Sequence, residues 1–328
     1  MLGAEHAQTL TTQHSLAYWR GRAGDTAGAI SAFEDLLAVR ARVLGPDHPR
    51  TRKTRQDLAR WRGMAGESEG ALAAFEELLA DQLRSLTSNH PYVLATRHNL
   101  AYWRGMAGDV LGAKAAFEEL LADRLRVLGS ADPWTLTTRH ELARWRGMAG
   151  DVLGAKAAFE ELLADRLRVL GSADPWTLTT RHELARWRGM AGDVLGAKAA
   201  FEGLLADRLR ILGPDHPQTL TTRNELARWQ GEAGDFVGAK TAFEELLADQ
   251  QRVLGSDDLR TMITRHELAR WRGMAGDVLG AKAAFEGLLA DRLRILGPDH
   301  PQTLTTRNEL ARWQGEGAGN SSAHQTTD

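Results

Sequence analysis

The sequence predicts an all-α fold, a helical-repeat solenoid of antiparallel helix pairs. The main observation is a strict internal period: repeated tryptophans stand 42 residues apart, and each is followed two residues later by glycine. These tryptophans are Trp19, Trp61, Trp103, Trp145, Trp187, Trp229, Trp271 and Trp313. Within each unit, two apolar stripes with helical spacing are separated by turn residues. Because a fixed period of this kind indicates a repeat architecture, we expect seven full repeats and a final half-repeat.

The first helix of a repeat is clearest around Trp145. Asp132 is suited to cap this helix, and Pro133 stands in the first turn, where its missing N–H costs nothing. Leu142 and Trp145 follow on one face at helical spacing. We expect the helix to run to about Arg146 and to be broken by Gly147 and Gly150.

The second helix of the same repeat begins after the turn, with Asp151 as its cap. Its predicted buried side includes Ala155, Phe159 and Leu162. Gly154 and Ala155 are small, so we expect them to let the two helices approach closely. No glycine is followed directly by Lys-Ser or Lys-Thr, and a phosphate-binding loop is therefore excluded. Since one apolar face cannot be buried by a single helix pair, stacking on neighbouring repeats must cover it.

A further sequence pattern joins the linker to the core positions. The linker Leu212–Thr219 precedes Asn224–Ala227, and Ala239 and Phe243 follow on the second helix. This combination resembles the tetratricopeptide repeats, in the 42-residue form of kinesin light chains and their bacterial relatives. The resemblance covers residues 1–316. It implies a right-handed superhelix whose first helices line a concave groove, in which extended peptides or partner helices lie.

The ends of the predicted solenoid differ from its interior. We expect residues 317–328 to form a disordered tail. The last helix copies an interior segment, so Leu310 and Trp313 would lack the second helix that normally covers them. Because solenoids usually finish with a polar capping element, we expect these uncapped ends to self-associate or to join a larger assembly.

Composition and charge exclude several classes of protein. The chain has 328 residues, a formal net charge of -2 and no cysteine. The charge excludes a globally basic nucleic-acid binder. The lack of cysteine excludes disulfides, thiolate nucleophiles and cysteine-based zinc sites, and fits a reducing compartment. No apolar run is long enough to span a membrane, and no signal peptide is recognisable. We therefore expect a cytoplasmic protein.

The resemblance implies that partner-binding residues lie on the first helices. His140 and Arg144 share a helix face, and their equivalents would form a basic ladder. Guanidinium groups suit carboxylates and the carbonyls of an extended chain, so we expect a protein or peptide partner, acidic or bound through its C-terminus. The expected groove residues are His98, Tyr102, His140, Arg144, His182, Arg186, Asn224, Arg228, His266 and Arg270.

Two other interpretations of this ladder, and one other function of the whole chain, stay open. It could be a solvated face whose charge Glu141 and its equivalents balance. It could bind a nucleic-acid backbone, although no interleaved aromatic residues are present to stack on bases. The resemblance also implies a regulatory or sensor array, because similar bacterial proteins are joined to nucleotide-hydrolysing switch domains.

A second candidate surface lies eleven residues before each repeated tryptophan. Because this position accepts Gln218 and Arg260, it is expected to be exposed. Three consecutive repeats place Tyr92, Trp134 and Trp176 there. Since exposed aromatic residues mark interfaces, we expect a partner-binding edge. The alternative is that each ring folds onto the neighbouring loop.

No catalytic residue, metal site or cofactor is expected. Equivalent histidines such as His140 and His182 stand a helix pair apart, roughly 10 Å or more, whereas zinc lies about 2 Å from its ligands. No nucleophile elbow of the Gly-x-Ser-x-Gly type occurs. The paired acids Glu160 and Glu161 diverge by about 100° around a helix. The sequence therefore predicts a scaffold rather than an enzyme.

Overall fold

The computed structural model describes residue 3 and residues 5–322 of the chain. Within these residues it contains fifteen α-helices and no β-strand, which confirms the all-α class. The helices fall into two compact units, residues 1–165 and residues 166–328. Odd-numbered helices are the first helices of the repeats, and even-numbered helices are the second.

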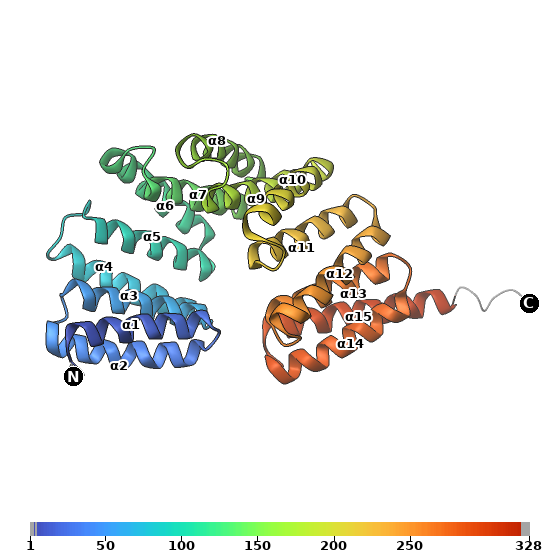
Figure 1. Ribbon diagram of the computed structural model, residues 1–328, viewed down its shortest axis with the longest axis horizontal. Helices are drawn as coiled ribbons and strands as arrows, with labels where there is room; N and C mark the ends of the chain where they lie inside the picture. Colours follow the sequence, from blue (N-terminus) through green and yellow to red (C-terminus); the bar gives the residue numbers. More distant parts are fainter. Residues whose placement is uncertain (1–2, 4, 323–328) are drawn as a thin grey trace, which may run out of the picture. The chain divides into compact units, whose positions relative to one another are not determined.

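The first unit is a stack in which each helix from α1 to α7 packs against the next along the chain (Figure 1). Its helices are α1 (Ala7–Arg22), α2 (Thr26–Leu44), α3 (Pro49–Met64), α4 (Ser68–Leu83), α5 (Pro91–Met106), α6 (Val110–Leu128), α7 (Pro133–Met148) and the first part of α8 (Val152–Leu170).

The second unit repeats this arrangement from α9 to α15. It contains the end of α8, then α9 (Pro175–Met190), α10 (Val194–Leu212), α11 (Pro217–Glu232), α12 (Phe236–Leu254), α13 (Leu259–Met274), α14 (Val278–Ile295) and α15 (Pro301–Ser322). The last helix thus continues past residue 316, where the tail was expected to begin. Residues 323–328 of that expected tail lie outside the described residues.

The first helices begin at capped positions. The Asp132 carboxylate accepts a hydrogen bond of 2.8 Å from the Trp134 amide, and proline follows the cap as predicted. Histidine takes the same role in other repeats, where the Nδ1 atoms of His48 and His216 each accept a backbone N–H at 3.2 Å.

The turn between paired helices depends on a single glycine. Gly150 has a φ angle of +98°, a left-handed conformation that glycine adopts without strain, and it lies between α7 and α8 as expected. Gly147 was expected to break the helix, but it lies inside α7, which runs to Met148. That expectation was wrong, because glycine at this repeat position serves packing between repeats.

The packing role is visible at Gly105, the equivalent residue on α5. A Cβ atom there would lie 2.3 Å from Cη2 of Trp145 in the next repeat. Only glycine therefore leaves room for the buried indole. The same contact joins Gly21 to Trp61, Gly63 to Trp103, Gly189 to Trp229, Gly231 to Trp271 and Gly273 to Trp313.

Gly154 also has a different role from the one expected. Its amide donates a 2.9 Å hydrogen bond to Oδ1 of Asp151, and a Cβ atom at Gly154 would lie 2.1 Å from Oδ2 of the same carboxylate. The capping carboxylate, rather than close approach of the paired helices, thus explains the glycine. Ala155 is fully buried, as predicted.

Each hydrophobic cluster combines a helix pair with the first helix of the next repeat. One cluster joins Leu94 of α5 and Phe117 of α6 to Trp145 of α7. At the last helix, Trp313 packs with Phe285 and is only 7% exposed. The expectation that Trp313 lacks cover was therefore wrong, because the preceding pair supplies it. Trp19 on α1 is instead 65% exposed.

Candidate partner-binding face

The arginines of the predicted ladder are partly exposed and are held by their neighbours. The Arg144 guanidinium lies 3.8 Å from the Glu141 carboxylate. Its Cζ atom lies 5.6 Å from the centroid of the Trp145 ring and 5.9 Å from that of Tyr102. A guanidinium over an aromatic face gains from the ring quadrupole. Arg144 is therefore positioned by side chains of its own chain.

The same arrangement recurs in the second unit. Arg228 lies 3.8 Å from Glu225 and 5.2 Å from the Trp229 centroid. Arg186 pairs with Glu183 over Trp187, and Arg270 pairs with Glu267 over Trp271. Burial raises the pKa of the Glu267 carboxyl group above its usual range. Each positive charge thus has a nearby carboxylate, and the face is charged but locally balanced.

The histidines do not contribute to a basic ladder, contrary to our expectation. The His98 ring lies edge-on to Phe117, with centroids 5.2 Å apart. Burial and the charge of Arg124 lower its pKa to about 4. His182 and His266 also have pKa values of about 4, because burial disfavours the charged ring. These histidines are neutral at pH 7.

His140 is buried in the same way. It is 9% exposed, and its ring lies edge-on to Phe159 at 5.2 Å. A histidine four residues from a surface arginine shares its helix face, but here the ring turns inward against the second helix. The histidines therefore pack between the first and second helices and are not part of the exposed face.

A buried arginine on the second helix was not identified from the sequence. Arg124 is 2% exposed and donates to the Trp134 carbonyl at 2.8 Å and to the Thr138 hydroxyl at 2.6 Å. It also donates to the Leu94 carbonyl at 3.2 Å, so it links the first helices of two repeats. Burial lowers its pKa to about 10, which keeps it charged at pH 7. The equivalent residues Arg40, Arg166, Arg208 and Arg292 make the matching contacts to the next repeat.

The aromatic edge residues are exposed, as expected. Tyr92, Trp134 and Trp176 are 48%, 60% and 54% exposed. Cζ of Arg124 lies 5.8 Å from the Trp134 centroid, and Cζ of Arg166 lies 5.6 Å from the Trp176 centroid. Each of these two indole rings thus contacts a buried guanidinium while remaining partly exposed to solvent. Their role in binding a partner stays a prediction.

Two repeats lack the buried arginine and have glutamine instead, at Gln82 and Gln250. In both, the residue 26 positions earlier is an amide, Gln56 or Asn224, where the arginine-containing repeats have histidine. Gln56 donates to the Thr96 hydroxyl at 2.9 Å, and Asn224 donates to the Thr264 hydroxyl at 3.2 Å. Asn224 and Gln250 are shorter than the histidine and arginine that they replace.

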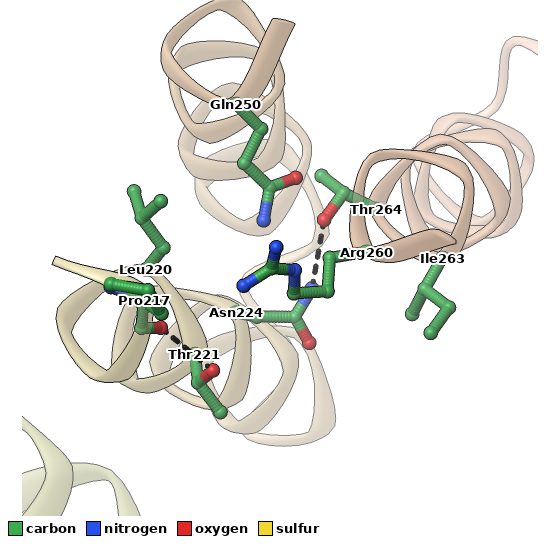
Figure 2. Close-up of a pocket in the computed structure, with 8 residues that line it drawn as sticks. All are labelled: Pro217, Leu220, Thr221, Asn224, Gln250, Arg260, Ile263 and Thr264. Carbon is green, nitrogen blue, oxygen red and sulfur yellow. Dashed lines mark hydrogen bonds between the residues drawn. The ribbon is translucent and has the colours of Figure 1, made fainter. Parts of the chain in front are cut away.

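These two shorter side chains lie at a pocket of about 120 Å³ between α11, α12 and α13 (Figure 2). One water molecule needs about 10–15 Å³ on the same measure. The pocket is lined by Pro217, Leu220, Thr221, Asn224, Gln250, Arg260, Ile263 and Thr264. Asn224 was predicted to be a groove residue. Arg260 occupies the repeat position that Trp134 and Trp176 occupy in the predicted aromatic edge.

The polar groups of this pocket are unequally satisfied. Gln250 is 3% exposed, and its Oε1 atom has no hydrogen-bond partner among the described residues. The Arg260 guanidinium, in contrast, is held by Asp258, with Nε and Nη2 3.1 Å and 3.0 Å from the carboxylate oxygens. The pocket therefore offers an unpaired buried acceptor beside a neutralised cation.

Within the described part of the chain, no group of three or more histidine, aspartate and glutamate residues could hold a metal ion. No helix there is both long and apolar enough to cross a membrane.

Comparison with known proteins identifies the repeat type. Residues 8–84 and 176–248 match the family model of the tetratricopeptide repeat. The nearly identical repeats of a kinesin light chain-like protein from Podospora anserina are 32% identical, with a TM-score of 0.55 over 63% of this chain and 97% of that one. No curated protein sequence matches.

More distant structures share the fold. BtubC from P. vanneervenii is 20% identical, with a TM-score of 0.57 over 71% of this chain and 94% of that one. A signal transduction ATPase with numerous domains from Pyrococcus horikoshii carries a tetratricopeptide repeat sensor. It is 11% identical, with a TM-score of 0.58 over 88% of this chain and 42% of that one.

Proposed function

Since this chain belongs to the tetratricopeptide repeat family, we propose that it is a non-catalytic scaffold that binds a protein or peptide along the face of its first helices. The observation that carries the proposal is the recurring group of an arginine, a tryptophan and a glutamate on this face. Arg144 with Trp145 and Glu141, and Arg228 with Trp229 and Glu225, are two examples.

The chemistry of this group favours an extended or acidic ligand. A guanidinium has five N–H donors in a rigid fork, and the single glutamate near Arg144 uses only part of them. The remaining donors are available to the carboxylates or backbone carbonyls of a bound peptide. Because the tryptophan ring fixes the guanidinium in advance, less side-chain entropy is lost on binding. A peptide with acidic residues, or a C-terminal carboxylate, fits this face best.

The aromatic edge extends the proposed binding surface. Trp134 and Trp176 each lie next to a buried arginine that holds the ring in place. Exposed tryptophans of this kind contribute strongly to interfaces, because they bury a large area with few rotatable bonds. We include Tyr92 in the same role. A cytoplasmic location belongs to this proposal, since the chain has no cysteine.

A second candidate function is a sensor array that acts with a nucleotide-hydrolysing switch protein. The supporting observation is the similarity to an ATPase whose tetratricopeptide repeats are a sensor. Binding of a nucleic-acid backbone is favoured least, because Glu141 and Glu225 lie within 4 Å of the arginines that would have to contact phosphates. Self-association is proposed at α1, where Leu16 and Trp19 are exposed.

A capture experiment tests the main proposal. The intact chain is compared with a ladder variant in which Arg144, Arg186 and Arg228 are changed to glutamine. The matched control carries the same three changes at Arg126, Arg210 and Arg252, which are exposed and ion-paired on second helices. The proposal expects a protein that the intact chain and the control retain and the ladder variant loses.

The alternatives give different results in the same experiment. Retention by all three chains would place binding elsewhere and overturn the assignment of the face. If the retained protein is a nucleotide hydrolase, the sensor function is favoured. Retention on heparin that falls steeply with salt would favour nucleic-acid binding.

A further inference from the structure

The pocket between α11, α12 and α13 lies where other repeats bury a guanidinium. In the preceding repeat, Arg208 Nη1 donates to the Gln218 carbonyl at 3.0 Å and to the Thr222 hydroxyl at 2.5 Å. Gln250 stands 42 residues after Arg208 and is too short to occupy the same place. The space that a guanidinium fills in one repeat is therefore the pocket in the next.

The groups that receive this guanidinium elsewhere are all present around the pocket. The equivalents of the Gln218 carbonyl and the Thr222 hydroxyl are the Arg260 carbonyl and the Thr264 hydroxyl. A third acceptor follows from Arg292, which donates to the Met262 carbonyl at 3.2 Å. Its equivalent in the pocket repeat is the Leu220 carbonyl.

Gln250 supplies one more acceptor. Its Oε1 atom is buried and has no partner among the described residues, which is costly unless a donor arrives. Figure 2 shows the Gln250 amide reaching toward Asn224, Arg260 and Thr264 from the opposite side of the pocket. Oxygen acceptors thus line part of a space that a planar, multiply donating group fits, beside the Arg260 guanidinium (Figure 2).

The walls nearer the surface are apolar. Leu220 is buried at the base, whereas Ile263 and Pro217 are exposed at the rim. Thr221 is also exposed, so the pocket can be reached from solvent on the side of the first helices. This order, apolar rim and acceptor-lined interior, matches an arginine side chain, whose methylene stem packs on apolar surface while its head makes hydrogen bonds.

The neighbouring positive charge does not prevent such binding. Arg260 is neutralised by Asp258 at 3.0 Å. The first repeat already combines the two groups, because Arg40 is buried next to Arg50, the equivalent of Arg260, and donates to its carbonyl at 3.1 Å. The fold therefore accommodates a guanidinium beside an arginine at this position.

We propose that the pocket formed by Asn224, Gln250 and Thr264 binds a guanidinium group, the head of an arginine side chain carried by a partner polypeptide. Binding of the guanidinium does not depend on the proposed scaffold function, but its origin in a polypeptide rests on that function. The partner then provides the guanidinium that the arginine-containing repeats provide from their own second helices.

Titration with small probes tests the pocket without any partner. Acetyl-arginine methylamide is added to the full chain, and binding is followed by calorimetry and by side-chain amide NMR signals. We expect it to bind at least tenfold more tightly than the citrulline analogue, which has the same shape without the charge, and than the lysine analogue. Equal binding of citrulline, or preferential binding of the glutamate analogue, would overturn the proposal.

Variants of the chain locate the site. Gln250→Arg fills the pocket from within and should weaken binding of the arginine probe at least tenfold. Gln82→Arg makes the same change in the other glutamine repeat and should leave the affinity unchanged. Gln250→Met removes the amide at similar length and should also weaken binding, which keeps the test decisive if the arginine variant folds poorly. Unchanged affinity in both Gln250 variants would refute the site.

Agmatine distinguishes the source of the group. If it binds tenfold more tightly than the arginine methylamide, the ligand is a free amine rather than a polypeptide side chain, and that part of the proposal fails. Probe binding together with a failed capture experiment would contradict the scaffold function and the polypeptide origin of the guanidinium, but not the pocket itself. Successful capture without probe binding would contradict only this pocket.

Discussion

The indole ring of Trp145 lies directly against the backbone at Gly105, in the first helix of the preceding repeat. A Cβ atom at Gly105 would approach the ring to 2.3 Å, and Trp145 is fully buried. Gly105 lies inside α5 and has no positive φ angle, so its conformation does not require glycine. The requirement comes only from the ring of the next repeat.

Gly105→Ala is therefore expected to destabilise the fold by about 1–3 kcal/mol, the usual cost of inserting atoms into a packed core. Urea unfolding followed by circular dichroism measures the change in free energy of unfolding. Trp145→Phe combined with Gly105→Ala should recover part of the loss, because the smaller ring leaves room for the methyl group. An unchanged stability in Gly105→Ala would show that the indole does not depend on this contact.

Gly287→Ala is expected to have the opposite effect. Gly287 lies in the middle of α14 and is exposed, and a Cβ atom added there would have nothing within 4 Å. Alanine in a helix interior is more stable than glycine by about 0.5–1 kcal/mol. Thermal unfolding of the two glycine variants side by side should show shifts of opposite sign. A loss of stability in Gly287→Ala would contradict the open surroundings of this residue.

The helices, their caps and most of the apolar core could be predicted from the sequence, because period and helical spacing specify them directly. The roles of His98 and Arg124 could not. A polar residue among apolar ones at helical spacing looks exposed, and its burial depends on carbonyls contributed by other helices. A usable signal was present, since Arg124 continues the apolar spacing of Phe117 and Leu120.

The pocket was equally beyond prediction from the sequence. It depends on Asn224 and Gln250, which stand 26 residues apart and are both shorter than their counterparts. Either change alone looks like a conservative polar substitution. Only the packing of α11, α12 and α13 shows that the two shortened side chains adjoin the same space.

Tryptophan accessibility checks the assignment of buried and exposed rings. Trp19, Trp134 and Trp176 are at least 54% exposed, whereas Trp313 is 7% exposed. We expect acrylamide to quench a rapidly accessible fraction that Trp134→Phe and Trp176→Phe together reduce. Trp313→Phe should leave this fraction unchanged. A decrease in Trp313→Phe would instead support an uncovered last helix.

Stability should fall as the pH is lowered from 7 to 5. His98, His182 and His266 have folded-state pKa values of about 4, below the ordinary 6.5. Between these values the unfolded chain binds protons that the folded chain does not, so lowering the pH favours unfolding. The expected loss is about 1–2 kcal/mol per histidine at pH 5.

Urea unfolding at several pH values measures this dependence. His98→Asn introduces asparagine, which another repeat has at the equivalent position, Asn224. This variant should lose the part of the pH dependence that His98 contributes. Gln8→Asn is a control at an exposed position and should not alter it. An identical pH dependence in His98→Asn would mean that His98 titrates normally in the folded chain.

The pairing of histidine with the buried arginine predicts coupling between positions 224 and 250. Arg40 Nη1 lies 3.2 Å from His14 Nδ1, and His98 stands 26 residues before Arg124 in the same register, where the arginine charge helps to lower the pKa of its ring. Asn224→His and Gln250→Arg together rebuild this pair inside the pocket. We expect the double variant to be more stable, by about 0.5–1 kcal/mol, than the summed effects of the two single changes would make it. The reason is that the new histidine can accept a hydrogen bond from the new arginine, as His14 does from Arg40.

A double-mutant cycle from urea unfolding gives the coupling energy. Strict additivity would show that the two positions act independently, and the pocket would then not result from their joint shortening.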